Sequence, residues 1–247
     1  MSLHVGSLYQ STQCASFHTV PHGQFGHNNR NIYQPTRAPL FPNCEETGAP
    51  FKVGGPIWLG PLHDDQVVET AVKRLESKGD HVVPDMKWIS TKTRLHGLLT
   101  SVSEELSDVP LYYSLPDLCH TLHCTSPPLV QFKAALVNAG YRVSAYHKEP
   151  QAIKTDAPNR IVWDIMRAWC REHPPKENRK KHKIGDETAK KILAVESSIQ
   201  VDFTVPKGFD EKKKAQRFPE NPEKNWGPKP RASGHKRKGI DVSSSPS

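Results

Sequence analysis

The sequence lacks the glycine-rich loops with which enzymes hold the phosphates of nucleotides and dinucleotides. Neither G-x-G-x-x-G nor G-x-x-x-x-G-K-[ST] occurs in its 247 residues. The adjacent glycines Gly54 and Gly55 are followed by Pro56, and no strand–turn–helix pattern surrounds them. Because those loops build the phosphate cradle of such folds, their absence excludes a nucleotide-binding fold from this stretch of chain.

Long apolar runs and a secretory signal are also missing. No run approaches the roughly 20 apolar residues that a membrane helix needs, and "MSLHVGSLYQ" has no basic segment followed by an apolar one. Five cysteines are an odd number, which does not suit a disulfide framework. We therefore expect an intracellular protein with reduced thiols and no membrane partner. The pattern leaves the nucleus, the cytoplasm and the mitochondrion open.

Paired cysteines, which a zinc ribbon uses as C-x-x-C, are absent too. Cys14 and Cys44 stand 30 residues apart, and the positions that would complete the two pairs hold Ser11 and Thr47. One interpretation is a ribbon-like segment without metal, held by packing, and we expect no bound zinc. The other is a site completed by nearby histidines, for which the metal candidates are Cys14, Cys44, His18 and His22.

No residue pattern predicts nucleophilic catalysis. Cys124 follows His123, but neighbours in sequence rarely form a working pair. Cys119 and Cys170 fall on or near apolar faces, where a free cysteine behaves as a small core residue. The prediction is therefore that none of these cysteines is catalytic.

Charge is present but unevenly placed. The chain has 34 Lys and Arg against 26 Asp and Glu, and from Arg171 to the end the balance is 19 against 11. The whole excess of positive charge thus lies in the C-terminal part, after a neutral body. This layout is typical of a protein that attracts a polyanion through its tail, although a solvated charged tail has the same composition.

Apolar residues at helical spacing predict two helices in the first half of the body. One runs from Asp64 or Asp65, either of which could cap it, to about Ser77. The second runs from about Thr91 to Ser107.

The next stretch alternates between short strands and helices. "PLYYS" predicts a short strand, Ser114 then caps a brief helix, and Ser126 caps another helix that has Pro127 in its first position and ends at Gly140. "YRVSAYH" and "AIKTD" alternate at period two and predict a hairpin. A further helix is expected over 158–172. Helix, strand, two helices and a hairpin is the order of a winged helix.

The fold class is therefore α+β, with a winged-helix-like domain and flanking helices. After it, "KKILAVESSIQVDFTVP" predicts a helical turn and a strand with Val201, Phe203 and Val205 on one side. Four parts are expected: an irregular, degenerate zinc-ribbon-like segment over 1–55, the winged-helix-like domain over 56–172, a basic connector plus strand over 173–206, and a basic, largely extended or disordered tail over 207–247.

Nucleic acid is the partner that these features favour. The last helix before the hairpin carries only one cation, Lys133. Recognition of base edges in the major groove usually needs more Arg and Lys side chains than this. Contact with phosphates, which gives affinity with little sequence information, fits better. The predicted nucleic-acid-binding residues are Arg142, Lys148, Lys154, Arg160, Arg167, Arg179, Lys180, Lys181, Lys183, Lys229, Arg231, Lys236, Arg237 and Lys238.

Several motifs, in order along the chain, resemble the C-terminal half of the eukaryotic tRNA guanine-26 dimethyltransferases, and the resemblance covers about residues 9–232. The motifs are "GGPIWLGPLHD" (54–64), "ELSDVPLYYSL" (105–115), "LHCTSPPL" (122–129), "KTDAP" (154–158) and "NPEKNWGPKPRA" (221–232).

The resemblance implies transfer of two methyl groups from S-adenosylmethionine to the exocyclic amine of guanine 26 in tRNA. In that family the donor domain and an acidic D-P-[FY]-G-type motif lie upstream of the stretch that matches here, so no catalytic residue is carried over. This chain is then expected to hold tRNA without methylating it, with the donor bound by an absent domain or a separate catalytic subunit. The family's paired cysteines are replaced at Ser11 and Thr47.

The tail has two interpretations at Trp226. The ring either stacks on a base or sugar, or pins the tail to the domain surface, and we favour the anchor because Pro and Gly fix an extended path around it. Two alternatives to an RNA-binding module remain at this stage: a winged-helix regulator that binds DNA, and a protein-interaction module.

Overall fold

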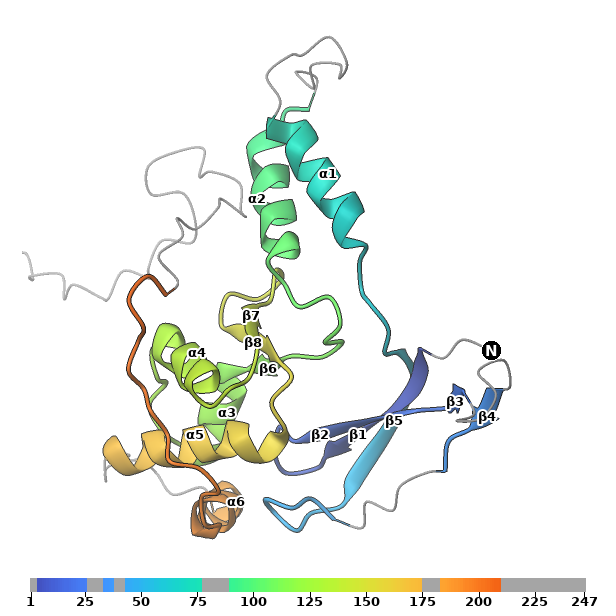
Figure 1. Cartoon of the computed structure of the whole chain (residues 1–247). Coiled ribbons are helices and arrows are strands. Elements are labelled where there is room, and N and C mark those ends of the chain that lie inside the picture. The colour runs from blue at the N-terminus through green and yellow to red at the C-terminus, as the bar shows by residue number, and fades with distance from the viewer. Residues whose placement is uncertain (1–3, 26–32, 38–42, 77–88, 175–182, 210–247) are drawn as a thin grey trace, which may run out of the picture.

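The computed structural model has mixed α/β structure, with three small sheets and six helices among the residues it describes (Figure 1). Those residues are 4–25, 33–37, 43–76, 89–174 and 183–209.

The N-terminal part forms an antiparallel sheet in the order β2-β1-β5. Its strands are β1 (Val5–Ser11), β2 (Phe17–Pro21) and β5 (Phe51–Trp58), and β1 pairs with both neighbours. The expectation of irregular structure over 1–55 was therefore wrong, because β5 pairs across the expected boundary. β3 (Gly23–Phe25) and β4 (Tyr33–Pro35) form a separate two-stranded pair.

Two antiparallel helices, α1 (Asp65–Glu76) and α2 (Lys92–Ser103), project from the rest of the molecule (Figure 1). The carboxylate of Asp64 accepts the backbone N–H groups of Gln66 and Val67 at 2.9 and 3.1 Å, so the predicted cap is confirmed. The two helices pack against each other and bury Val68 and Leu75 of α1, whereas Val67 stays exposed.

The central part follows the predicted order of helix, strand, two helices and hairpin. Its short strands form an antiparallel sheet in the order β6-β8-β7, which brings the hairpin back beside the strand before α3. The elements are β6 (Tyr113–Ser114), α3 (Leu115–Leu122), α4 (Leu129–Asn138), β7 (Val143–Ala145), β8 (Ala152–Thr155) and α5 (Asn159–Glu172).

The start of α4 differs from the prediction, although its end does not. Pro128 is the residue before the first helical turn, and the Ser126 side chain does not cap the helix. Pro127 precedes another proline, and a residue in that position avoids the α region, so the helix begins only at Leu129. At the other end Gly140 has a φ of 88°, a left-handed value that suits glycine. Ser114 precedes α3 without a side-chain capping bond.

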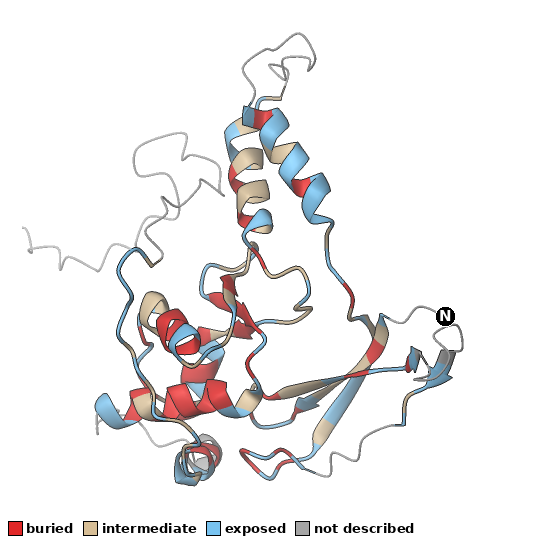
Figure 2. Ribbon diagram, viewed as in Figure 1, coloured by how far each residue is buried: buried red, intermediate tan, exposed pale blue. Residues whose placement is uncertain are grey.

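Helix α5 is the centre of the core, and Figure 2 shows it almost wholly buried along its middle. Ile165 and Met166 are fully buried within it. The indole N–H of Trp163 donates to the hydroxyl of Ser16 at 2.8 Å, which fixes the N-terminal sheet to this helix. A large buried ring satisfies its one polar atom in this way.

Arg167 of α5 is a fully buried charge that joins distant segments. Its guanidinium donates to the carboxylates of Glu46 and Asp164, each at 2.5 Å, and to the Ile192 carbonyl at 3.3 Å. Asp164 in turn accepts the backbone N–H of Ser198 at 3.0 Å. Burial raises the pKa of Glu46 although Arg167 opposes the rise, so the desolvated carboxylate depends on its cation.

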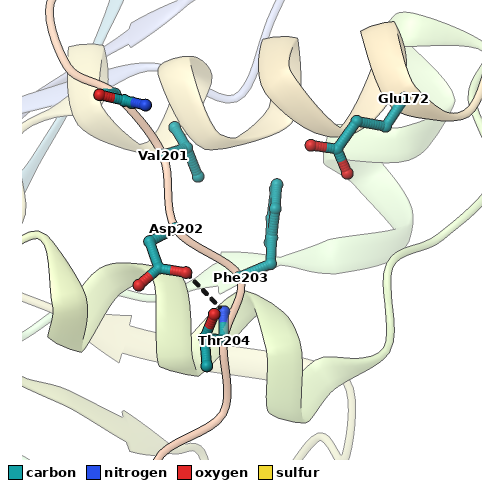
Figure 3. A pocket seen from close by; sticks show the side chains of 6 residues that line it. Glu172, Val201, Asp202, Phe203 and Thr204 are labelled. Carbon is teal, nitrogen blue, oxygen red and sulfur yellow. Dashed lines mark hydrogen bonds between the residues drawn. The ribbon is translucent and has the colours of Figure 1, made fainter.

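The C-terminal part begins with α6 (Lys183–Ala194), a full helix where only a turn was expected. The predicted strand after it is extended but pairs with no strand of the described chain. Instead, the side-chain amide of Asn138 donates to the carbonyls of Asp202 and Thr204, both at 3.0 Å. Figure 3 shows Phe203 and Val201 beside α5, where Phe203 packs edge-on against Trp169.

Replacing Arg167 with Met should destabilise the fold by about 3–5 kcal/mol, because two buried carboxylates lose their cation. The measurement is urea unfolding at neutral pH. Arg171 lies on the same helix but is exposed, so Arg171→Ala is the matched control and should change stability by less than about 0.5 kcal/mol. Equal effects of the two substitutions would contradict the role given to Arg167.

Candidate nucleic-acid interface

A cleft of about 540 Å³ lies at the N-terminal end of α5. Its walls come from β2, from the loop before β6 and from the β8–α5 connection. Two of the motifs on which the family resemblance rests, 105–115 and 154–158, therefore meet at one place. Both Arg142 and Arg160 line this cleft, so the fold brings together two of the predicted RNA-binding residues.

Arg142 is held in place by two carboxylates. Its Nη2 lies 2.7 Å from Asp108 and its Nε lies 2.7 Å from Asp156. The guanidinium of Arg142 holds the pKa of Asp108 below its ordinary value. Because two negative charges already surround this cation, its attraction for a phosphate is weakened, and it serves mainly to join the hairpin to the loop before β6.

Asn159 fixes the geometry of the cleft, a role that the sequence did not reveal. Its side-chain amide donates to the Phe17 carbonyl at 2.8 Å and accepts the Phe17 N–H at 3.1 Å. The hydroxyl of Tyr113 donates to the same amide oxygen at 2.7 Å. A single Asn thus joins β2, β6 and the first turn of α5. In the sequence, the only sign of this role is that Asn159 directly follows Pro158 at the start of the predicted helix.

Lys154 was predicted to bind RNA, and the structure shows that this prediction was wrong. The side chain is 1% exposed, and its ammonium lies 2.5 Å from the equally buried carboxylate of Glu105. Strand β8 is buried along its whole length, so a cation on it has no path to a phosphate.

Arg167 is the second correction among the predicted RNA-binding residues. It is fully buried in the network with Glu46 and Asp164 described above. Sequence position alone could not separate it from Arg160, which lies seven residues earlier on the same helix and is exposed.

The other predicted cations have different positions. Lys148 is exposed in the turn between β7 and β8, and Lys183 is the first residue of α6. The remaining candidates, with the predicted anchor Trp226, lie outside the described residues: Arg179, Lys180, Lys181, Lys229, Arg231, Lys236, Arg237 and Lys238.

The two N-terminal cysteines do meet. Cys14 Sγ and Cys44 Sγ are 3.6 Å apart in a buried position, and both cysteines are free. The hydrogen bond to Cys44 and the burial of the thiol both raise the pKa of Cys14. His22 instead hydrogen-bonds the Ser7 hydroxyl at 2.8 Å, and the ring of His18 packs edge-on against Phe51. Among the residues that the structure describes, no three His, Cys, Asp or Glu side chains converge to hold a metal ion.

A family model described as N2,N2-dimethylguanosine tRNA methyltransferase matches residues 2–167. This chain belongs to that family.

Longer relatives in the dimethyltransferase family align along nearly the whole chain. The Arabidopsis thaliana "tRNA (guanine(26)-N(2))-dimethyltransferase 2" is 40% identical over 235 residues, which is 93% of this chain and 38% of the relative. The Homo sapiens protein named "tRNA (guanine(26)-N(2))-dimethyltransferase" is 36% identical over 91% of this chain and 34% of its own length. The chain thus spans well under half of these relatives.

A solved structure, "Complex structure of Trm1 from Pyrococcus horikoshii with S-adenosyl-L-Methionine", aligns with a TM-score of 0.46 and 24% identity. The alignment covers 66% of this chain and 35% of that one. Among the described residues of this chain, we find no helix that could span a lipid bilayer.

The pairing of Arg142 with Asp108 predicts a pKa change that carboxyl carbon NMR can measure. Asp108 should titrate below its ordinary pKa of about 3.9, and Arg142→Gln should raise it towards that value. Since the folded pKa is depressed, this pair stabilises the fold above about pH 3.9 and the contribution is lost as pH falls through the folded pKa.

Asp202 provides the internal control for this titration. Hydrogen bonds from Thr204, and not Arg142, lower its pKa, so the substitution should leave it unchanged. An Asp108 pKa that stays low in the variant would show that Arg142 is not the cause.

Proposed function

We propose that this chain is the tRNA-binding portion of an S-adenosylmethionine-dependent tRNA (guanine(26)-N(2))-dimethyltransferase. The methyl-donor site lies outside these residues, in the larger part of the relatives' length that the chain does not span. The observation that carries the proposal is the cleft at α5, where two family motifs converge beside an exposed Arg160.

The arrangement of charge supports contact with the tRNA backbone more than reading of bases. Arg160 lines the cleft and Lys148 occupies the turn of the hairpin, and both side chains are exposed. The basic residues from Arg171 onward add further positive charge along the chain. Phosphate contacts of this type steer a large polyanion and respond steeply to salt.

The order of elements from α2 to β8 supports a winged-helix-like domain, in which the β7–β8 hairpin is the wing. Its sheet has the order β6-β8-β7, so the strand before α3 pairs with the wing. We place the end of this domain at about residue 172, followed by a connector over 173–206 and a basic tail over 207–247. A regulator that binds duplex DNA has this topology as well, but the family favours tRNA.

The N-terminal sheet supports a degenerate zinc ribbon. Ser11, Cys14, Cys44 and Thr47 are all buried, and the pKa of Cys44 is lowered first by its hydrogen bond with Cys14 and then by the hydroxyl groups of Thr47 and Ser11. In a tetrahedral site with Zn–S bonds of about 2.3 Å, neighbouring sulfurs lie about 3.8 Å apart. The observed 3.6 Å between the two thiols is close to that spacing. Packing and hydroxyl contacts replace the metal.

Purified chain should bind unmodified tRNA with an affinity that falls steeply as salt rises, and should transfer no label from S-adenosylmethionine to guanine. Arg160→Ala should weaken binding several-fold and reduce the slope of log affinity against log salt by about one. Lys73, an exposed cation on the projecting α1, is the control, and Lys73→Ala should change neither quantity.

Three results would contradict the proposed function. Label in guanine would place the methyl-donor site within this chain, a clear preference for duplex DNA at matched salt would favour the regulator, and failure to bind either polymer at low salt would leave an interaction module.

The double substitution Ser11→Cys and Thr47→Cys should create a zinc site by supplying the two missing thiolates. Elemental analysis should find about one zinc per chain, and cobalt substitution should give thiolate charge-transfer absorption. Ser11→Cys alone is the control and should hold metal weakly. No metal in the double variant would contradict the ribbon interpretation.

A further inference from the structure

Two tyrosines stack on each other at the surface of the hairpin, away from the α5 cleft. The rings of Tyr112 and Tyr146 have centroids 4.4 Å apart and an interplanar angle of 22°. Tyr112 is 39% exposed although it packs against its neighbour. Neither of these tyrosines lines the cleft at α5. The residues on either side of Tyr112, which are Leu111 and Tyr113, line it. The pair is called the tyrosine platform below.

A buried ion pair supports the platform from beneath. The Lys154 ammonium lies 5.6 Å from the centre of the Tyr146 ring and 2.5 Å from the Glu105 carboxylate. Glu105 also accepts the backbone N–H of His147 at 3.0 Å and contacts its Nδ1 at 2.8 Å. Both Tyr146 and His147 are therefore held by groups that cannot move without uncovering a charge.

This support is costly, which argues that it has a purpose beyond stability. Two fully desolvated charges gain little net free energy over apolar residues of similar size. Burial raises the pKa of Glu105, but the bonds from Lys154 and His147 outweigh that effect and hold the pKa below its ordinary value. The pair fixes the orientation of an aromatic surface, and a rigid aromatic surface loses little entropy when a second ring stacks on it.

We propose that the tyrosine platform stacks an unpaired base of tRNA on Tyr112, with Lys148 next to the adjoining phosphate. The inference rests on the proposed function, since it names the part of the RNA that this surface receives. Every base offers a flat π-face, so stacking tolerates any sequence. Lys148 is exposed two residues after Tyr146 and supplies the positive charge, while Glu149 beside it limits how much phosphate can gather there.

Lys154 and Glu105 are positioning residues in this arrangement. They act on the RNA only through the ring of Tyr146 and the backbone of His147. Lys154 and Glu105 are the first residues of two family motifs, 154–158 and 105–115. We explain their presence there by their role in orienting Tyr146 and His147, and not by contact with phosphate.

The test compares tRNA binding by the whole chain across a range of salt for Tyr112→Ala, Tyr112→Phe and Lys148→Ala. Loss of one base stack should lower affinity about tenfold at every salt concentration and leave the salt slope unchanged. Tyr112→Phe keeps the ring and should bind like the parent. Lys148→Ala should reduce the salt slope by about one.

A matched control is Trp58→Ala. Trp58 is another exposed aromatic residue, 47% accessible, on the N-terminal sheet, and its removal should leave the affinity unchanged. Thermal unfolding of each variant shows whether the fold persists, and Tyr112→Phe reports on the ring without that concern.

The outcomes separate this inference from the proposed function. Parent chain that binds tRNA while Tyr112→Ala binds equally well would overturn the platform and leave the proposed function standing. An equal loss in Tyr112→Phe and Tyr112→Ala would overturn stacking as the cause. Parent chain that binds neither tRNA nor an unstructured twelve-nucleotide RNA would overturn both.

Discussion

The guanidinium of Arg167 is the contact on which the arrangement of this chain depends. It joins Glu46 from the N-terminal segment, Asp164 of its own helix and the Ile192 carbonyl at the end of α6. Those groups lie up to about 150 residues apart in sequence. A charge with five donors in a fixed plane suits this task, because each donor specifies the direction of a different segment. The cleft, the β7–β8 hairpin and the extended segment after α6 all pack around α5, the helix that carries Arg167.

Regular elements with strong periodicity could be predicted from the sequence, and pairing over long distances could not. The helices α1 and α5 and the β7–β8 hairpin lie where their apolar spacing placed them. β5 escaped prediction because "FKVGGPIW" contains two glycines and a proline, and it becomes a strand only through pairing with β1. The extended strip after α6 was expected to be a strand for its alternation, yet Asn138 satisfies its carbonyls in place of a partner strand.

The candidate site shows the same division. Charge and motif order indicated which residue types belong near RNA, and Arg160 and Lys148 are exposed as that role requires. Burial depends on how the whole chain packs, however. The sequence alone therefore could not show that Lys154 and Arg167 are buried while Arg160 and Lys148 are exposed. Asn159 and Tyr112 carry no charge, and their importance arises from geometry alone: one joins three elements, and the other stacks on a ring 34 positions away.

The amide of Asn138 has a consequence for how this protein behaves at high concentration. An extended segment with open carbonyls is a template on which another polypeptide can add a strand, and natural proteins guard such edges against fibrous association. By occupying the carbonyls of Asp202 and Thr204, one side chain on α4 closes that edge without building a sheet. These two hydrogen bonds therefore keep the extended segment after α6 from pairing with the same segment of another copy of the chain.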